Sequence, residues 1–125
     1  MLNSILLYAG SIIIAVWGIA HIIPTKGVVT GFGKLSQDNT RIITMEWIAE
    51  GLTLVFIGAL TLAVTLIAGR RDPGAVVVYR GCALMLVVMA GLTLATGART
   101  KIIPIKTCPF VKAAVAILFV VGSMG

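Results

Sequence analysis

Charged residues are scarce in this sequence of 125 residues: there are ten Lys and Arg, four Asp and Glu, and one His. Hydrophobic residues make up 59% of the chain, and its mean hydropathy is +1.12. Soluble domains contain roughly 25% charged residues, whereas this chain contains 11%. The composition therefore excludes a water-soluble fold and predicts an integral membrane protein.

Cysteine, histidine and aromatic residues are also few. The two cysteines, Cys82 and Cys108, are predicted near opposite ends of one helix and its loop, too far apart for a disulfide, so we expect two free thiols. One His and four acids offer too few ligands at a recognisable spacing for a metal site. The net charge is +6, and the Lys and Arg residues that produce it lie beside hydrophobic spans. They do not form basic runs interleaved with aromatic residues. We therefore expect lipid headgroups as its partner and no nucleic acid.

Long uncharged stretches are what the sequence does contain. They cover residues 1–25, 51–69, 81–98 and 113–125. A helix that crosses the hydrocarbon core needs about 20 apolar residues, so four crossings use about 80 residues and leave no second domain. The predicted helices cover about residues 2–23, 42–68, 76–96 and 109–124. The expected fold is all-α: an antiparallel four-helix membrane bundle that forms one domain over residues 1–125.

Proline and glycine mark the predicted helix ends. Pro24 ends the first helix and is followed by a polar loop over residues 25–40, while residues 69–74 form a tight turn. Residues 102–107 are expected to be an interfacial linker, with Cys108 capping the last helix and Pro109 at its first position. Residues 1–24 carry no basic region before their apolar stretch, which predicts a retained anchor instead of a signal peptide.

The distribution of Lys and Arg predicts the orientation. The first and third loops share one side with Lys26, Lys34, Arg41, Arg99, Lys101, Lys106 and Lys112; the other side has Arg70, Arg71 and Arg80. The positive-inside rule then makes loops one and three cytoplasmic, in what we expect is a bacterial cytoplasmic (inner) membrane. Lipid headgroup contacts are expected from Lys26, Arg99, Lys101, Lys106 and Lys112, the last by extending its side chain to the interface.

Polar and aromatic residues from distant parts of the chain converge on the side of loops one and three. In an antiparallel bundle, the ends of the first and third helices meet the beginnings of the second and fourth. The candidate ligand-binding residues there are Trp17, His21, Glu46, Trp47, Glu50 and Cys108. Trp17 and His21 share a helix face, and so do Glu46 and Glu50. Such a cluster could bind a polar head or relay a proton.

A purely structural interpretation is also open for these residues. Glu46 can be solvated near a helix start, His21 can be an interfacial residue with its own hydrogen bond, and Cys108 can act as a cap. The threonines of the second helix are expected to face the bundle and to hold helices together. Six glycines are expected to let helices approach closely: Gly10, Gly18, Gly51, Gly58, Gly81 and Gly91.

Short motifs resemble the DoxX-like group of small four-helix membrane proteins. The resemblance rests on Trp17-Gly18-Ile19-Ala20-His21, on Glu50-Gly51-Leu52-Thr53-Leu54 with Gly58, and on the short basic turn that follows. It covers roughly residues 5–100. It implies a four-helix bundle of a kind sometimes associated with quinone-linked or thiol-oxidising membrane complexes. The paired cysteines expected for thiol chemistry do not occur in this sequence.

Three functions follow as hypotheses. The first is a small non-catalytic membrane subunit that packs against, stabilises or anchors a larger membrane complex, or associates with copies of itself. The second is an oxidoreductase-associated bundle that binds a quinone or another amphipathic lipid near His21, Glu46 and Glu50. The third, a proton-coupled transporter, is disfavoured because the first helix contains no acid. Nothing in the sequence resembles a catalytic motif, which favours a protein that is not itself an enzyme.

Overall fold

The structure, a computed structural model, describes residues 1–125 and is helical throughout, with no strands. Its elements are α1 (Leu2–Ile22), α2 (Thr25–Gly31), α3 (Gln37–Ile67), α4 (Pro73–Ala95), the 3-10 helix η1 (Gly97–Arg99) and α5 (Ile103–Gly122). Four helices, α1, α3, α4 and α5, are long and apolar enough to cross a membrane. The predicted fold class is confirmed: the protein is an all-α integral membrane protein built as a four-helix bundle.

Side-chain caps determine where two of the long helices begin. The Ser36 hydroxyl accepts a hydrogen bond from the Asn39 backbone N–H (3.1 Å), so α3 begins at Gln37, five residues before the predicted start. The Asp72 carboxylate accepts from the Ala75 N–H (3.0 Å), so α4 begins at Pro73. Between them lies the predicted tight turn, in which Gly69 has a positive φ of 81°.

The predicted start of the last helix is wrong. Helix α5 begins at Ile103, six residues before Pro109, and the expected linker over residues 102–107 is mostly helical. Pro104 lies in the first turn of α5, where its missing N–H costs little, and therefore takes the role that had been assigned to Pro109. Cys108 is consequently no cap: Cys108 and Pro109 lie inside the helix and are buried in the bundle.

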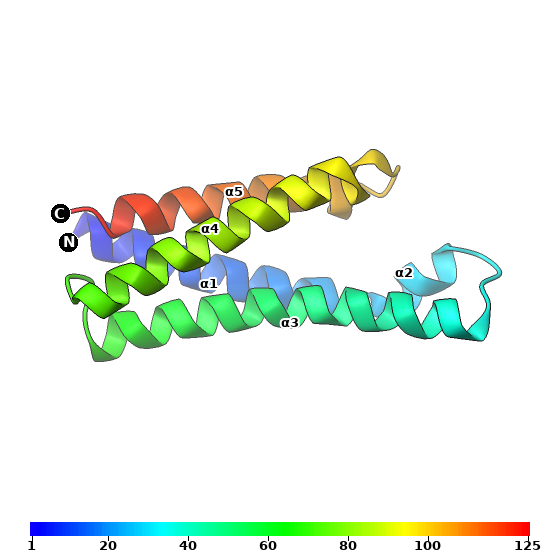
Figure 1. Ribbon diagram of the computed structural model, residues 1–125, viewed down its shortest axis with the longest axis horizontal. Helices are drawn as coiled ribbons and strands as arrows, with labels where there is room; N and C mark the ends of the chain where they lie inside the picture. Colours follow the sequence, from blue (N-terminus) through cyan, green and yellow to red (C-terminus); the bar gives the residue numbers. More distant parts are fainter.

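The first loop is also more ordered than expected, because it contains the short helix α2 (Figure 1). Helix α3 is the longest element, with 31 residues. At about 1.5 Å per residue it extends about 46 Å, well beyond a hydrocarbon core of about 30 Å. Three of its four charged residues, Asp38, Arg41 and Glu46, lie in its N-terminal third. This end of α3 therefore projects beside α2, at the side of loops one and three.

The four long helices pack unequally. Helix α1 packs most extensively against α3, α4 packs against α5, and α1 and α5 join the two pairs, whereas α3 and α4 have much less contact. Figure 1 shows α4 separating from α3 toward the end that carries α2 and η1. That end, the side of loops one and three, is called the open end below. The opposite end, which holds both termini and the α3–α4 turn, is called the closed end.

Glycines explain the close contact of α1 with α3. A Cβ at Gly18 would lie 2.7 Å from the backbone O of Gly51, and one at Gly58 would lie 2.5 Å from the backbone O of Ser11. The prediction that glycines let helices approach closely is therefore confirmed for Gly18, Gly51 and Gly58. It is also confirmed for Gly10, which lies against Phe119 of α5. Gly81 and Gly91 are different, because nothing lies within 4 Å of a Cβ at either position. These two glycines face outward on α4.

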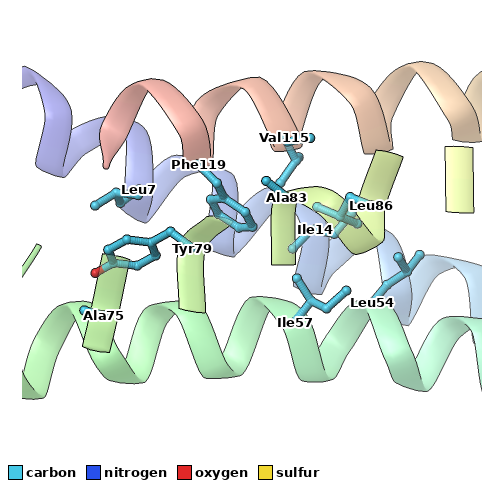
Figure 2. Packing of buried hydrophobic residues seen from close by; sticks show 11 residues of the cluster. Leu7, Ile14, Leu54, Ile57, Ala75, Tyr79, Ala83, Leu86, Val115 and Phe119 are labelled. Atoms are coloured by element: carbon cyan, nitrogen blue, oxygen red, sulfur yellow. The ribbon is translucent and has the colours of Figure 1, made fainter. Parts of the chain in front are cut away.

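The bundle interior is apolar with a few paired hydroxyls. Figure 2 shows the core residues, with Tyr79 of α4 and Phe119 of α5 among the largest fully buried side chains. The Thr65 and Tyr79 hydroxyls are 2.8 Å apart, as are those of Ser11 and Thr61. The prediction that the threonines of the second helix face the bundle holds for Thr61 and Thr65, which are both buried. The core cluster comprises Leu7, Ile14, Leu54, Ile57, Ala75, Tyr79, Ala83, Leu86, Val115, Ala116 and Phe119.

Candidate functional site

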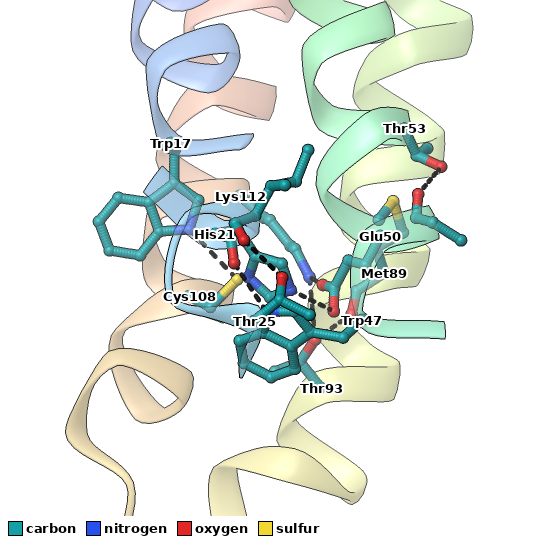
Figure 3. A network of polar contacts seen from close by, with 12 residues as sticks. Trp17, His21, Thr25, Trp47, Glu50, Thr53, Met89, Thr93, Cys108 and Lys112 are labelled. Carbon is teal, nitrogen blue, oxygen red and sulfur yellow. Dashed lines mark hydrogen bonds and ion pairs between the residues drawn. The ribbon is translucent and has the colours of Figure 1, made fainter. Parts of the chain in front are cut away.

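Five of the six candidate ligand-binding residues come together at the open end of the bundle (Figure 3). Trp17 and His21 come from α1, Trp47 and Glu50 from α3, and Cys108 from α5. Glu46 does not join them, since its side chain is exposed and neither ion pair of the protein includes it. It lies on the projecting part of α3, where a carboxylate can be solvated or interact with headgroups.

His21 is held in place by Trp47. Their rings are stacked, with centroids 4.0 Å apart and an interplanar angle of 15°. The Trp47 indole Nε1–H also donates a hydrogen bond to the backbone O of His21 (2.7 Å). This second contact fixes the end of α1 to α3, so that the imidazole has little freedom to turn away from its neighbours.

The imidazole itself has unused hydrogen-bonding capacity. The His21 side chain is only 8% exposed, and its buried Nε2 has no hydrogen-bond partner. The Glu50 Oε2 lies 3.6 Å from Nε2, which is longer than a hydrogen bond. A buried nitrogen without a partner is unusual, because leaving such a group unsatisfied costs about 1–3 kcal/mol. The carboxylate nearby favours a proton on Nε2, which leaves Nδ1 as the acceptor.

Glu50 and Lys112 form an ion pair inside the bundle. The Lys112 Nζ donates to the Glu50 Oε1 and also to the Thr93 hydroxyl (3.0 Å), which in turn donates to the backbone O of Met89 (2.9 Å). Lys112 is completely buried, whereas the Glu50 side chain is 30% exposed. The network thus joins α3, α4 and α5 at the end where α3 and α4 are least in contact.

The expected headgroup contact of Lys112 is wrong. Its side chain is completely buried and ends on Glu50 instead of at the membrane surface. An acid on the neighbouring helix offers the ammonium a nearer charged partner. The other expected headgroup contacts, Lys26, Arg99, Lys101 and Lys106, are exposed at the open end. For those four, contact with lipid headgroups stays a prediction.

Trp17 and Cys108 link α1 to α5. The Trp17 Nε1–H donates to the Cys108 Sγ at 3.3 Å, and the Cys108 side chain is buried. A thiol is a weak acceptor, so this contact orients the indole more than it stabilises the bundle. Both cysteines are free thiols, and the structure brings together no group of three His, Cys, Asp or Glu side chains that could hold a metal ion.

Trp17, His21 and Trp47 line a cavity of about 390 Å³ at the open end. Its wall is almost entirely apolar, and His21 is the polar side chain in it. The lining residues are Trp17, Ala20, His21, Pro24, Val28, Trp47, Ile102, Pro104 and Ile105. Three of them, Pro24, Val28 and Ile102, also line an adjoining hollow beside α2. The cavity is therefore bounded by α1, α2, α3 and the first turn of α5.

Sequence reasoning missed the residues that complete this site. Lys112 and Thr93 join the polar network, and Ile102, Pro104 and Ile105 form a wall of the cavity because α5 begins earlier than expected. A signal for Lys112 was present: a lone cation within an apolar helix requires an acid on another helix, and Glu50 is the deepest acid of the chain. Pro104 at the start of an apolar run was the corresponding signal for the helix start.

Comparison with known proteins gives no relative: no family model, no curated protein and no solved structure matches the chain.

Proposed function

We propose that the protein binds an amphipathic ligand with a polar ring, of which a quinone is the class that fits best, in the cavity beside His21. One observation carries the proposal: a buried imidazole with an unpartnered nitrogen lies in the wall of an otherwise apolar cavity, between two Trp side chains. Binding pockets for small molecules are typically 300–1,000 Å³, mostly apolar, and contain a few fixed polar groups. The cavity agrees with each of these properties.

Quinone chemistry matches the arrangement of the residues. A quinone offers ring oxygens for hydrogen bonds with His21, a flat face for contact with Trp17 or Trp47, and an apolar tail. The adjoining hollow beside Pro24, Val28 and Ile102 gives that tail a continuous apolar path along α2. The resemblance to DoxX-like proteins, some of which are associated with quinone-linked complexes, agrees with this proposal.

In this proposal Glu50 and Lys112 act as positioning residues. The Glu50 carboxylate lies 3.6 Å from the His21 Nε2 and holds the imidazole orientation electrostatically, while Lys112 neutralises the carboxylate. The ligand oxygen then accepts a hydrogen bond from the His21 Nε2–H, which has no hydrogen-bond partner in the protein. The role proposed for the chain is binding and orientation of the ligand, which requires no chemical step by the protein itself.

Tryptophan fluorescence tests the proposal directly, because the only two Trp residues of the chain, Trp17 and Trp47, both line the cavity. The protein in lipid nanodiscs is titrated with a short-chain benzoquinone, which quenches indole fluorescence on contact. We expect saturable quenching, with a half-saturating concentration that rises about tenfold in His21→Leu, the effect of losing one hydrogen bond to a buried polar group. Circular dichroism verifies that the variant is folded.

Two carboxamide variants provide the matched control. Glu50→Gln removes the charge that faces His21, whereas Glu46→Gln removes a charge one helical turn away that the structure leaves exposed. Quenching should weaken in Glu50→Gln and be unchanged in Glu46→Gln. Quenching that rises linearly with the benzoquinone and is equal in all variants would mean partitioning into the lipid, and the proposal would be wrong.

A second candidate function, a non-catalytic membrane subunit, is favoured by one separate observation. Gly81 and Gly91 face outward on α4, whereas the glycines of the α1–α3 pair are in helix contacts. Small residues on an exposed membrane helix allow the helix of another subunit to approach closely. Chemical cross-linking in native membranes tests this: Gly81→Leu and Gly91→Leu should abolish a cross-linked complex that forms with the wild-type chain. A wild-type chain that is never cross-linked contradicts it.

We further propose that the open end faces the cytoplasm of a bacterial cell, because its exposed cations outnumber those of the closed end. The C-terminus, at the closed end, then lies outside the cytoplasm. A reporter enzyme that works only outside the cytoplasm should therefore be active when it is fused there. Activity of a cytoplasmic reporter at that position would reverse the orientation.

A further inference from the structure

An apolar groove lies between α4 and α5 on the outside of the bundle, away from the His21 cavity. It has a volume of about 560 Å³ and lies between small side chains, including Ala83 of α4 and Ala113 of α5. Eight of its nine lining residues are hydrophobic, and the ninth is Arg80. The residues that line it are Arg80, Ala83, Leu84, Val87, Ala113, Ala116, Ile117, Val120 and Val121.

Arg80 is a cation without a partner in the protein. Its side chain is exposed, and both ion pairs of the structure involve Glu50, at the open end. Arg80 lies seven residues after Pro73, the first residue of α4, and therefore about 10 Å along the axis of this helix. Because helical side chains point back toward the N-terminus, its guanidinium extends toward the headgroup level at the closed end. A guanidinium near the membrane surface that has no anion in the protein can bind the phosphate of a lipid.

Arg80 and the apolar groove lie along α4 in the same order as the phosphate and the acyl chains of a phospholipid. The cation lies at the closed end, near the membrane surface, and the apolar part continues past Leu84 to Val87 and Ala113, toward the membrane centre. A lipid in the same leaflet has its phosphate at the surface and its acyl chains below. Arginine binds phosphate strongly because its planar fork donates two hydrogen bonds at once.

We propose that this groove is a binding site for one anionic phospholipid, with its phosphate on Arg80 and one acyl chain between α4 and α5. A second copy of the chain is a poorer occupant, because it has no free acid to place against Arg80. Of its four acids, Asp38 and Glu46 lie toward the open end, Glu50 is paired with Lys112, and Asp72 caps α4. The proposal is independent of the ligand proposed for the His21 cavity.

Native mass spectrometry with lipids of defined headgroup tests the site. The protein is titrated with phosphatidylglycerol and with phosphatidylcholine of the same acyl chains, and the first bound lipid is quantified. We expect phosphatidylglycerol to bind about tenfold more tightly than phosphatidylcholine, as one charge-assisted contact predicts. Arg80→Gln should abolish this preference. Arg71→Gln is the matched control, because Arg71 is exposed at the same end and does not line the groove.

A second pair of variants tests the acyl-chain part of the site without changing any charge. Ala113→Leu fills the groove and should weaken binding of both lipids, whereas Ala114→Leu places the same side chain on an exposed neighbouring position outside the groove. Equal loss of phosphatidylglycerol binding in Arg80→Gln and Arg71→Gln would show general charge attraction and overturn the proposal. So would a protein dimer that forms in the wild type and is abolished by Ala113→Leu.

Discussion

The two ends of the bundle satisfy their buried polar groups in different ways. At the closed end the polar groups are neutral hydroxyls that pair with one another, such as Thr65 with Tyr79 (2.8 Å), and the turn at Gly69 brings α3 and α4 together. At the open end the groups are charged, α4 separates from α3 (Figure 1), and one imidazole nitrogen has no partner. The buried hydroxyls of the closed end pair with each other, whereas the charged pair of the open end lies next to His21, which lines a cavity.

This difference shows which end of the bundle contains buried charges. Neutral hydroxyls that bond their own helix or each other cost little to bury in a membrane. A Glu and a Lys are far more expensive and are usually found at functional positions. Glu50 and Lys112 of the open end lie beside His21, which lines the cavity, and the closed end has no buried charged side chain. The following variants test the contrast between the two ends, in order of expected effect.

The largest effect is expected from breaking the ion pair of the open end on the Glu50 side. Glu50→Leu leaves the completely buried Lys112 ammonium without its anion and should lower the free energy of unfolding by about 3 kcal/mol, the lower end for buried pairs. Lys112→Met should cost less, because Glu50 is partly exposed. Unfolding in detergent measures both. The double variant should regain most of the stability, and a double variant that is no better than Glu50→Leu would contradict the expected pairing.

An intermediate effect is expected in the α1–α3 contact that extends between the two ends. A Cβ at Gly58 would lie 2.5 Å from the backbone O of Ser11, so Gly58→Ala should lower the free energy of unfolding by about 1–3 kcal/mol. The matched control is Gly81→Ala, where nothing lies within 4 Å; that variant should stay within about 0.5 kcal/mol of the wild type. Equal unfolding curves for the two variants would mean that α1 and α3 are not in such close contact.

The smallest effect is expected at the closed end. Tyr79→Phe removes one hydroxyl from its pair with Thr65, whose own hydroxyl still donates to the backbone O of Thr61 (2.6 Å). Hydrogen bonds between membrane helices average about 0.6 kcal/mol, and we expect a loss of that size in the same unfolding assay. A loss as large as that of Glu50→Leu would remove the distinction between the two ends.

Much of the fold could be predicted from the sequence because the membrane imposes a simple rule. Four uncharged stretches of sufficient length predict four helices, and Pro24 and the residues around Gly69 mark two of their ends. Helix starts were harder to predict, because they depend on single interactions such as the Ser36 cap and on which of two prolines, Pro104 or Pro109, begins α5.

The site was predictable only in part. Antiparallel helices place Trp17, His21, Trp47, Glu50 and Cys108 at one end, and the structure agrees. Helix spacing also placed Glu46 on the face of Glu50, yet Glu46 is one turn nearer the projecting end of α3 and is exposed. Lys112 could reach either lipid or protein, and only the packing of α5 against its neighbours decides between them. The cavity depends on α2, which no local pattern had suggested, and on the early start of α5, for which Pro104 was a signal that Pro109 also matched.

The most direct test concerns His21, the only histidine of the chain. Protein labelled with ¹⁵N-histidine in lipid nanodiscs gives the two ring-nitrogen signals of this one residue, and a short-chain benzoquinone is added in steps. If the His21 cavity binds such a ligand, at least one ring-nitrogen signal shifts progressively and reaches a plateau. Two signals that stay unchanged, while the benzoquinone is present in the nanodisc, would contradict the proposed function.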